Sequence, residues 1–302
     1  MFSSIRAWIF PQASAPGDIH DPNAFVAAFG SLSDRQWLRT LLSSIRKPVQ
    51  RGLALPGFPP ATVQRNFVGS ADDAALREAA RFYAIVKKYC GELDVPLRGT
   101  SRVLDFGVGW GRILRFFLKD VAVSGLYGAD VDADVLDTCR AIGVRGTLFQ
   151  TQATGRLEYP DGYFDVVYAY SVFSHLSEAA HLFWIEELAR VLRPGGILIV
   201  TTEARHFFEF CASLQGKPPE SGWHRSLAAA FPDPAAAMRQ YDAGHFVYAP
   251  TGGGDFRDAS FYGEAAIPRA YVERVWTKFL DLRCFIDDRK LFWQALIVMQ
   301  AR

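Results

Sequence analysis

The sequence is poor in cysteine and has no excess of charge of either sign. Its 302 residues include only four cysteines, and no two of them stand at a C-x-x-C spacing. The common zinc patterns and a disulfide framework are therefore excluded, and we expect free thiols and no bound metal. The 33 basic and 32 acidic residues leave a formal net charge of +1. Nucleic-acid binding would need a basic excess, so we expect no nucleic-acid partner.

Long apolar runs are also missing. No stretch approaches the roughly 20 apolar residues that a membrane helix needs. The opening segment, MFSSIRAWIFPQ, has one basic residue, Arg6, and an apolar core that breaks at Pro11, too short for a secretory signal. We therefore expect a cytoplasmic protein with no membrane partner. The sequence leaves the oligomeric state open.

Apolar strands and helices alternate regularly after residue 100. This alternation is typical of βαβ units, which build a parallel sheet covered by helices on both faces. The last two strands are joined by only a few residues, so they can pair only antiparallel. The helix before the first strand is expected to be capped by Ser70 and to end at Gly91. Strands are predicted over 101–106, 125–129, 146–150, 164–172, 196–202, 279–286 and 292–300, with helices over 111–120, 132–142, 177–192 and 268–276.

One stretch, VLDFGVGWGR at residues 103–112, combines an acid with a glycine-rich loop. A nicotinamide-binding turn reads G-x-G-x-x-G, whereas this loop has one residue instead of two before its third glycine. The carboxylate of Asp105 would repel a pyrophosphate and attract an ammonium group. S-adenosylmethionine (SAM) has an ammonium group and no phosphate. The charges therefore favour SAM over a nicotinamide cofactor.

A second acid indicates an adenosine ligand. The stretch GADVD places Asp130 at the end of the next strand. A carboxylate there can accept hydrogen bonds from both ribose hydroxyls. Because this feature would suit NAD equally well, it indicates the ribose without choosing the cofactor.

With these motifs in this order, the chain resembles class I, seven-stranded SAM-dependent methyltransferases. VLDFGVGWGR is similar to the family's first motif and LYGADVD to its acid-bearing second strand. YPDGYFDVVYAYSVFSHL resembles the fourth-strand motif, and LARVLRPGGILIVTT the motif around strand five. The resemblance implies an α/β fold with a doubly wound, mostly parallel seven-stranded sheet and an antiparallel C-terminal edge strand.

The resemblance also implies how the chain is divided. Residues 70–204 would form the SAM-binding core, and residues 263–302 a C-terminal helix and hairpin that complete the sheet. Residues 1–69 are expected to form an N-terminal extension that covers the pocket. The stretch 205–262 is too long for a simple connection and is expected to be a lid over the carboxyl ends of the parallel strands.

A set of cofactor-binding residues follows from the same resemblance. Asp105 would bind the methionine ammonium, and the glycines of the loop would let the backbone approach the cofactor. Asp130 would hold the ribose, and Val131 and Gln152 would contact adenine. Arg112 could reach the methionine carboxylate, and Tyr170 and Ser171 would border the methionine portion. The complete set is Asp105, Gly107, Gly109, Gly111, Arg112, Asp130, Val131, Gln152, Tyr170 and Ser171.

Motifs that are absent after the fourth strand exclude several classes of methyl acceptor. YAYSVF contains neither the Asn/Asp-Pro-Pro-aromatic run of base N-methylators nor the carboxylates of the metal-dependent catechol type, and no Pro-Cys nucleophile is present. We therefore expect a metal-independent methyltransferase that acts on a small molecule. O-methylation is favoured over N- or C-methylation. The stretches YGEAAIPRAYVERVW and GWGRILRFFL also resemble methyltransferases of polysaccharide and secondary-metabolite pathways. This resemblance suggests that the methyl acceptor is a hydroxyl of a sugar or a natural product.

A hydroxyl acceptor needs a general base. His175, after the fourth strand, and His245, in the insertion, are the catalytic candidates. Further candidates are Glu203, His224, Tyr248, Tyr262 and Glu264. Two other classes stay open, a SAM-binding protein without transferase activity and, less favoured, an NAD-dependent oxidoreductase.

Overall fold

The computed structural model describes residues 21–254 and 256–302, which divide into two compact units. The first unit contains the described residues up to 151 together with 163–168, and the second contains 152–162 and 169–302. Residues 1–20 lie outside the described residues. They include the opening segment, for which we expect no secretory signal, and the start of the predicted N-terminal extension.

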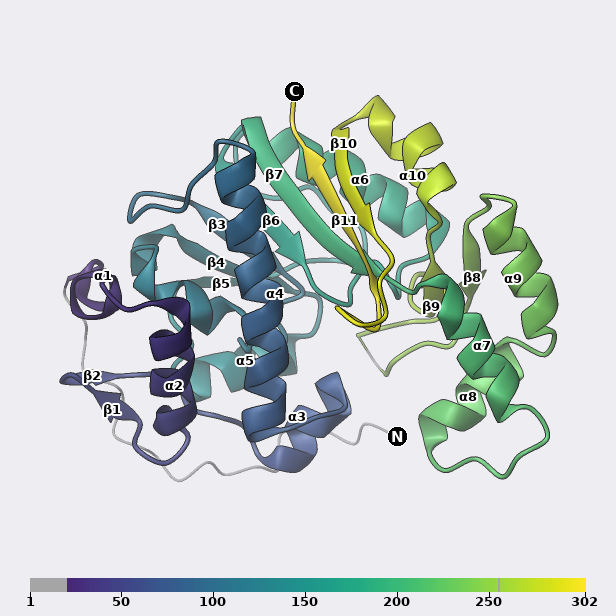
Figure 1. Cartoon of the computed structure of the whole chain (residues 1–302), viewed down its shortest axis with the longest axis horizontal. Coiled ribbons are helices and arrows are strands. Elements are labelled where there is room, and N and C mark those ends of the chain that lie inside the picture. Colours follow the sequence, from purple (N-terminus) through teal and green to yellow (C-terminus); the bar gives the residue numbers. More distant parts are fainter. Residues whose placement is uncertain (1–20, 255) are drawn as a thin grey trace. The chain divides into compact units, whose positions relative to one another are not determined.

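A seven-stranded sheet contains all the long strands (Figure 1), in the order β10-β11-β7-β6-β3-β4-β5. β3 pairs in parallel with β4 and β6, and β4 pairs in parallel with β5. The last strand, β11, is antiparallel to β7 on one side and to the outermost strand, β10, on the other. The predicted fold class is thereby confirmed. The strands span Val103–Phe106 (β3), Leu126–Asp130 (β4), Thr147–Gln150 (β5), Phe164–Ala169 (β6), Leu192–Thr202 (β7), Asp281–Ile286 (β10) and Ala295–Gln300 (β11).

The helices that accompany the sheet agree with the predicted ones except at the first. Where a helix was expected over 111–120, the chain makes a turn and then a 3-10 helix. Gly111 has a φ of +72°, which an α-helix cannot accommodate, and the six residues that follow it are all buried. The helical elements are α4 (Asp72–Glu92), η2 (Leu114–Lys119), η3 (Val123–Gly125), α5 (Ala133–Ala141), α6 (Glu178–Val191), α10 (Arg269–Val275) and η4 (Trp276–Lys278).

The predicted cap of α4 is wrong. The helix begins after Ala71, no side chain caps it, and it continues through Gly91. Gln64 supplies the reason, because its side-chain oxygen accepts a hydrogen bond from the backbone N–H of Asp72 at 2.9 Å. One of the amides that Ser70 would have capped is thus satisfied from another helix.

The described part of the first 69 residues has regular secondary structure. They form α1 (Ala24–Phe29), α2 (Asp34–Ser44), a short hairpin of β1 (Val49–Gln50) and β2 (Leu53–Ala54), and α3 (Ala61–Val68). α2 starts with a capping box, in which Ser33 and Gln36 each bond the other's backbone N–H.

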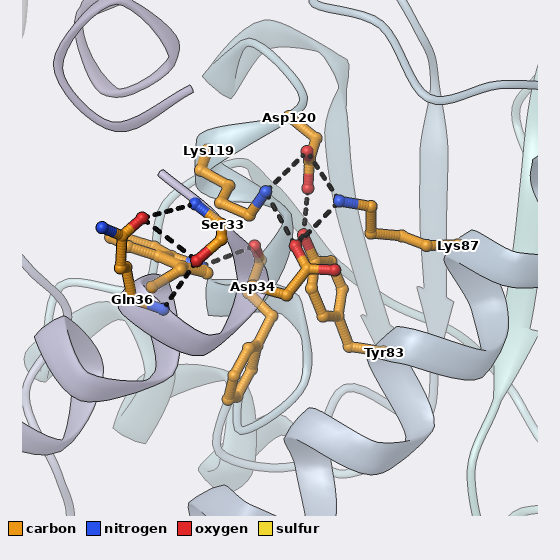
Figure 2. Close-up of polar contacts among 9 residues, drawn as sticks. Ser33, Asp34, Gln36, Tyr83, Lys87, Lys119 and Asp120 are labelled. Carbon is orange, nitrogen blue, oxygen red and sulfur yellow. Dashed lines mark hydrogen bonds and ion pairs between the residues drawn. The ribbon is translucent and has the colours of Figure 1, made fainter. Parts of the chain in front are cut away.

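A network of charges fastens α2 to α4 and η2 (Figure 2). The Lys119 ammonium, only 3% exposed, lies 2.9 Å from Asp34 and 3.1 Å from Asp120. Lys87 bridges the same two acids at 2.9 and 3.3 Å, and the Tyr83 hydroxyl donates to Asp120. Each buried charge therefore has a partner, as a stable interior requires.

The predicted insertion is a compact piece with its own apolar core. It contains α7 (Arg205–Leu214), α8 (Gly222–Ala230), α9 (Pro234–Asp242) and β8 (Val247–Ala249), and β8 pairs antiparallel with β9 (Glu264–Ala266). Ala266 forms a bridge to Glu203, so β9 returns beside the end of β7. Its placement as a lid over the cofactor stays a prediction. The core consists of Phe207, Phe208, Cys211, Leu227, Phe231, Ala237, Tyr241, Val247, Ala249 and Ala266.

Within residues 21–254 and 256–302, no helix is both long enough and apolar enough to span a membrane.

Candidate functional site

The glycine-rich loop of the first unit leaves room beside its backbone. The backbone N–H groups of Gly107 and Val108 both donate to the carbonyl oxygen of Ala129, which fixes the loop to the end of β4. Gly109 has a φ of +51°, and a Cβ built on it would meet nothing within 4 Å. A Cβ on Gly111 would instead lie 2.6 Å from a methyl group of Val144. Gly111 is thus required by packing, whereas Gly109 borders open space.

Asp105 lies under this loop with an unsatisfied carboxyl oxygen. The residue is 2% exposed, and its Oδ2 has no hydrogen-bond partner. Burial raises the pKa of this carboxyl well above its usual range, and the charge of Asp130 adds to the effect, while Tyr168 and Arg112 oppose it. A buried carboxyl oxygen without a donor is costly, and a cationic ligand would satisfy it.

Asp130 connects the loop to the following turn. Its Oδ2 accepts from the Gly109 N–H at 3.0 Å, and its Oδ1 accepts from the Asp132 N–H at 3.1 Å. The Asp130 carboxylate therefore holds both the glycine loop and the turn after β4. The ribose contact that the sequence assigns to Asp130 stays a prediction.

The two arginines that follow the glycine loop, Arg112 and Arg115, are both buried against protein. Arg112 donates to the Ala75 carbonyl and lies 3.1 Å from the Glu78 carboxylate. Its predicted contact with the methionine carboxylate stays a prediction. Arg115 lies 4.9 Å from the Trp110 ring and donates to the Gly57 carbonyl at 2.9 Å. The loop is thereby held to the N-terminal residues by a side chain that the sequence analysis did not single out.

The remaining predicted cofactor contacts are placed at the ends of strands. Val131 is half-buried after β4, and Gln152 is exposed after β5. Tyr170 follows β6, with its ring 6.3 Å from that of Phe292. Ser171 has a φ of +57°, a conformation that costs a non-glycine residue energy and is concentrated at functional sites. Its N–H donates to Thr201 Oγ1 at 2.7 Å.

His175 of the second unit is held in a defined orientation. Its Nδ1 lies 2.8 Å from the carbonyl oxygen of Gly263 and 3.5 Å from Oε2 of Glu264. Its ring stacks on Tyr262, with centroids 4.8 Å apart. Because a carbonyl oxygen only accepts, Nδ1 carries the proton in the neutral ring, and Nε2 presents a lone pair.

Glu264 lies beside this histidine, and a second buried glutamate, Glu203, is close enough to Glu264 for their charges to interact; each has one satisfied oxygen. Glu203, at the end of β7, accepts from Gln294 at 2.8 Å, and Glu264, in β9, accepts from the Trp223 indole at 3.0 Å. Both residues are 4% exposed, and Oε2 of each has no hydrogen-bond partner. Burial raises the pKa of Glu203 to about 8, the charge of Glu264 raises it further, and Gln294 and Trp293 oppose the rise.

The second unit thus brings together four of the residues considered as bases, namely His175, Glu203, Tyr262 and Glu264. The side chain of His245 is exposed, with no hydrogen-bond or ion-pair partner among the described residues. His224 contacts Phe210 through its ring, and the Tyr248 hydroxyl donates to Ala259. The sequence analysis missed Trp223 and Gln294, because no local pattern relates either residue to the glutamate it contacts.

In the described part of the chain, no three His, Cys, Asp or Glu side chains are grouped so that they could hold a metal ion. The metal-independent reaction stays a prediction.

Part of the chain matches a known family, and curated proteins share the same region. Residues 104–200 match the family described as a methyltransferase domain. The 27-O-demethylrifamycin SV methyltransferase of Amycolatopsis mediterranei is 34% identical over 143 residues, which cover 42% of this chain and 46% of that protein. A ubiquinone/menaquinone biosynthesis C-methyltransferase of Pseudomonas paraeruginosa is 35% identical over 123 residues, which cover 38% of this chain and 46% of that protein. The chain therefore spans slightly less than half the length of these relatives.

Among solved structures, an S-adenosylmethionine-dependent methyltransferase from Clostridium acetobutylicum is similar with a TM-score of 0.49. It is 12% identical, and the alignment covers 73% of this chain and 91% of that one.

Proposed function

We propose that this chain, in which residues 104–200 form a methyltransferase domain, is a SAM-dependent methyltransferase of a small molecule. The class I family and the SAM cofactor expected from the motifs are confirmed at the level of this domain. The observation that carries the proposal for the whole chain is the unpartnered Oδ2 of Asp105, buried beside a loop with open space at Gly109.

The residues of the first unit fit this cofactor. Asp105 offers a carboxyl oxygen to the methionine ammonium. The Asp130 carboxylate, at the end of β4 and in contact with Gly109, would accept hydrogen bonds from the ribose hydroxyls. The bare backbone of Gly109 permits the close approach that a side chain would block. When bound, SAM supplies a methyl group on a sulfonium, which is an electrophile.

His175 is proposed as the general base. Its Nδ1–H donates to Gly263, which leaves Nε2 to take the proton of an acceptor hydroxyl. The ring then becomes cationic, and the carboxylate of Glu264, 3.5 Å from Nδ1, stabilises that charge. A base oriented by a carbonyl and backed by a carboxylate can contribute about 10²–10⁴-fold to the rate.

O-methylation of a hydroxyl is the favoured reaction, and N- or C-methylation is the alternative. The name of the Amycolatopsis relative specifies transfer to an oxygen, and that of the Pseudomonas relative transfer to a carbon. The oriented His175 favours oxygen here, because a hydroxyl has to lose its proton during transfer. We also propose a cytoplasmic location, which the four free cysteines support.

The test of the proposed function is calorimetric titration with S-adenosylhomocysteine, in buffer with and without a chelator. Wild type is expected to bind equally in both, and Asp105→Asn is expected to bind at least ten-fold more weakly. Asp137→Asn is the matched control, because Asp137 is exposed and pairs only with Arg140. Absence of binding by wild type contradicts the proposal. Binding without transfer to any hydroxyl, amine or carbon acceptor tested would favour a SAM-binding protein without transferase activity.

A further inference from the structure

The two glutamates beside His175 are flanked by tryptophans that reach the surface. Trp223 is 47% exposed and donates its indole N–H to Glu264. Trp293 is 38% exposed, and its side chain is close enough to Glu203 to influence its pKa. The Phe210 ring contacts both tryptophans, with its centroid 5.7 Å from the ring centroid of each. Two large exposed indoles on one aromatic surface are unusual for a site with no ligand.

The polar atoms under this aromatic surface are incompletely satisfied. Oε2 of Glu203 and Oε2 of Glu264 are both buried, and neither has a hydrogen-bond partner. The second oxygen of each residue is occupied, by Gln294 and by Trp223 respectively. Carboxyl oxygens accept hydrogen bonds, so only a donor would satisfy the two free atoms, and a cationic donor would do so best.

Gln294 holds Glu203 in place through one oxygen only. Its side-chain nitrogen donates to Ser171 Oγ at 3.0 Å and to Glu203 Oε1 at 2.8 Å, which uses both of its hydrogens. Its oxygen accepts from the Thr201 hydroxyl at 2.6 Å. With every group of Gln294 engaged, Gln294 cannot also satisfy Oε2 of Glu203.

From this arrangement we propose that the second unit binds the ammonium group of an amine-bearing acceptor, between the two glutamates and against the tryptophan rings. The carboxyl oxygens accept from the ammonium N–H groups, and an aromatic face attracts the same positive charge. The ring of Trp293 already attracts a cation, because the Arg289 guanidinium lies 5.2 Å from its centroid. This inference rests on the proposed function, and it specifies the acceptor as a hydroxyl compound that also carries an amine.

The repulsion between the two acids suits a cation. The charge of Glu264 contributes to the raised pKa of Glu203, and a cation bound between the two carboxyl groups would relieve that repulsion. A carboxylate or phosphate ligand would add to it.

The experiment compares two probes of nearly equal shape, phenethylamine and 2-phenylethanol, by calorimetry at pH 7 with the full chain. The titrations are made with and without S-adenosylhomocysteine. Wild type is expected to bind the amine at least ten-fold more tightly than the alcohol. In Glu203→Gln, which keeps the size of the side chain, the preference is expected to fall below three-fold.

Glu209→Gln is the matched control, since Glu209 is an exposed acid of the same insertion that pairs with Arg205; it is expected to keep the full preference. Equal binding of both probes by wild type overturns the inference without any variant, and so does an unchanged preference in a folded Glu203→Gln. An amine preference without S-adenosylhomocysteine binding would reject the proposed function alone. Binding of S-adenosylhomocysteine without the preference would reject the ammonium site alone.

Discussion

Each unit of the molecule contains a buried carboxyl group with an unsatisfied oxygen, and the two differ in their surroundings. Asp105 of the first unit lies under a glycine loop, near Tyr168 and Arg112, which lower its pKa against the effect of burial. Glu203 of the second unit faces another acid, Glu264, which raises its pKa further. Asp130 also raises the pKa of Asp105, but Arg112 offsets part of that effect, whereas no cationic group among the described residues offsets the effect of Glu264 on Glu203. The acid under the bare backbone suits the ammonium end of a cofactor, and the pair of acids suits a cationic group of an acceptor.

A buried carboxyl group with an unsatisfied oxygen arises from a different chain arrangement in each unit. In the first unit, neighbouring parallel strands bring Asp105 and Asp130 to the same edge of the sheet. In the second, β7 ends at Glu203, and an insertion with its own core returns Glu264 beside it. We propose a ligand site at the unpartnered acid of each unit, but only the acid of the first unit belongs to a short sequence motif.

The largest effect is expected at the proposed base. His175→Ala should lower the turnover of methyl transfer by about 10²-fold or more, because Nε2 no longer takes the hydroxyl proton. Affinity for S-adenosylhomocysteine should stay unchanged in the same variant. His245→Ala is the matched control, and we expect its turnover to stay within a few-fold of wild type, because no contact orients that side chain. Loss of turnover in His245→Ala, but not in His175→Ala, would identify His245 as the general base instead.

The next effect tests the ribose contact in the first unit. Asp130→Ala should weaken S-adenosylhomocysteine binding by about 1–3 kcal/mol, since the ribose hydroxyls lose their acceptor and the Gly109 N–H loses its partner. Asp137→Ala removes an exposed acid from the following helix and serves as control. Calorimetric titration gives both affinities, and equal values for the two variants would mean that the ribose lies elsewhere.

The two acids also predict how stability depends on pH. The pKa of Glu203 is raised to about 8 in the folded chain, so between pH 4.5 and 8 the folded chain holds a proton at Glu203 that the unfolded chain has lost. Its contribution to stability is therefore full below pH 4.5 and is lost as the pH rises to about 8. In Glu203→Gln this contribution disappears, so across that window its free energy of unfolding should rise, relative to wild type, by up to about 1.4 kcal/mol per pH unit.

Urea unfolding at several pH values between 5 and 8.5 measures this difference. Glu209→Gln should retain the wild-type pH dependence, because Glu209 is exposed. Parallel curves for wild type and Glu203→Gln would show that Glu203 is ionised throughout, and the paired-acid interpretation would then be wrong.

The positions of Asp105 and Asp130 follow from local rules and could be predicted from the sequence, whereas their contacts with a cofactor stay predictions. A strand, an acid and a glycine turn fix Asp105, and the parallel neighbour of that strand fixes Asp130. The 3-10 helix after Gly111 was not predictable from periodicity, since its two charged residues, Arg115 and Lys119, are buried together with its apolar ones.

The second unit's constellation could be predicted only as a collection of candidates. His175, Glu203 and Glu264 were each considered as bases, but nothing in the sequence indicated that Trp223 would donate to one glutamate and Gln294 to the other. These contacts join residues 41 and 91 positions apart. They depend on the packing of the insertion, which no local pattern specifies.

The smallest effect is expected from a single methyl group on the glycine loop. Gly109→Ala should lower the free energy of unfolding by about 1–2 kcal/mol, the cost of a left-handed backbone in alanine. Gly52→Ala is a closely matched control, because Gly52 in the β1–β2 turn has a φ of +79° and an equally open environment. Urea unfolding should therefore give similar losses for both variants, but S-adenosylhomocysteine binding should weaken, at least five-fold, only in Gly109→Ala. If Gly109→Ala binds as tightly as Gly52→Ala, the open space beside the loop is not where the cofactor lies.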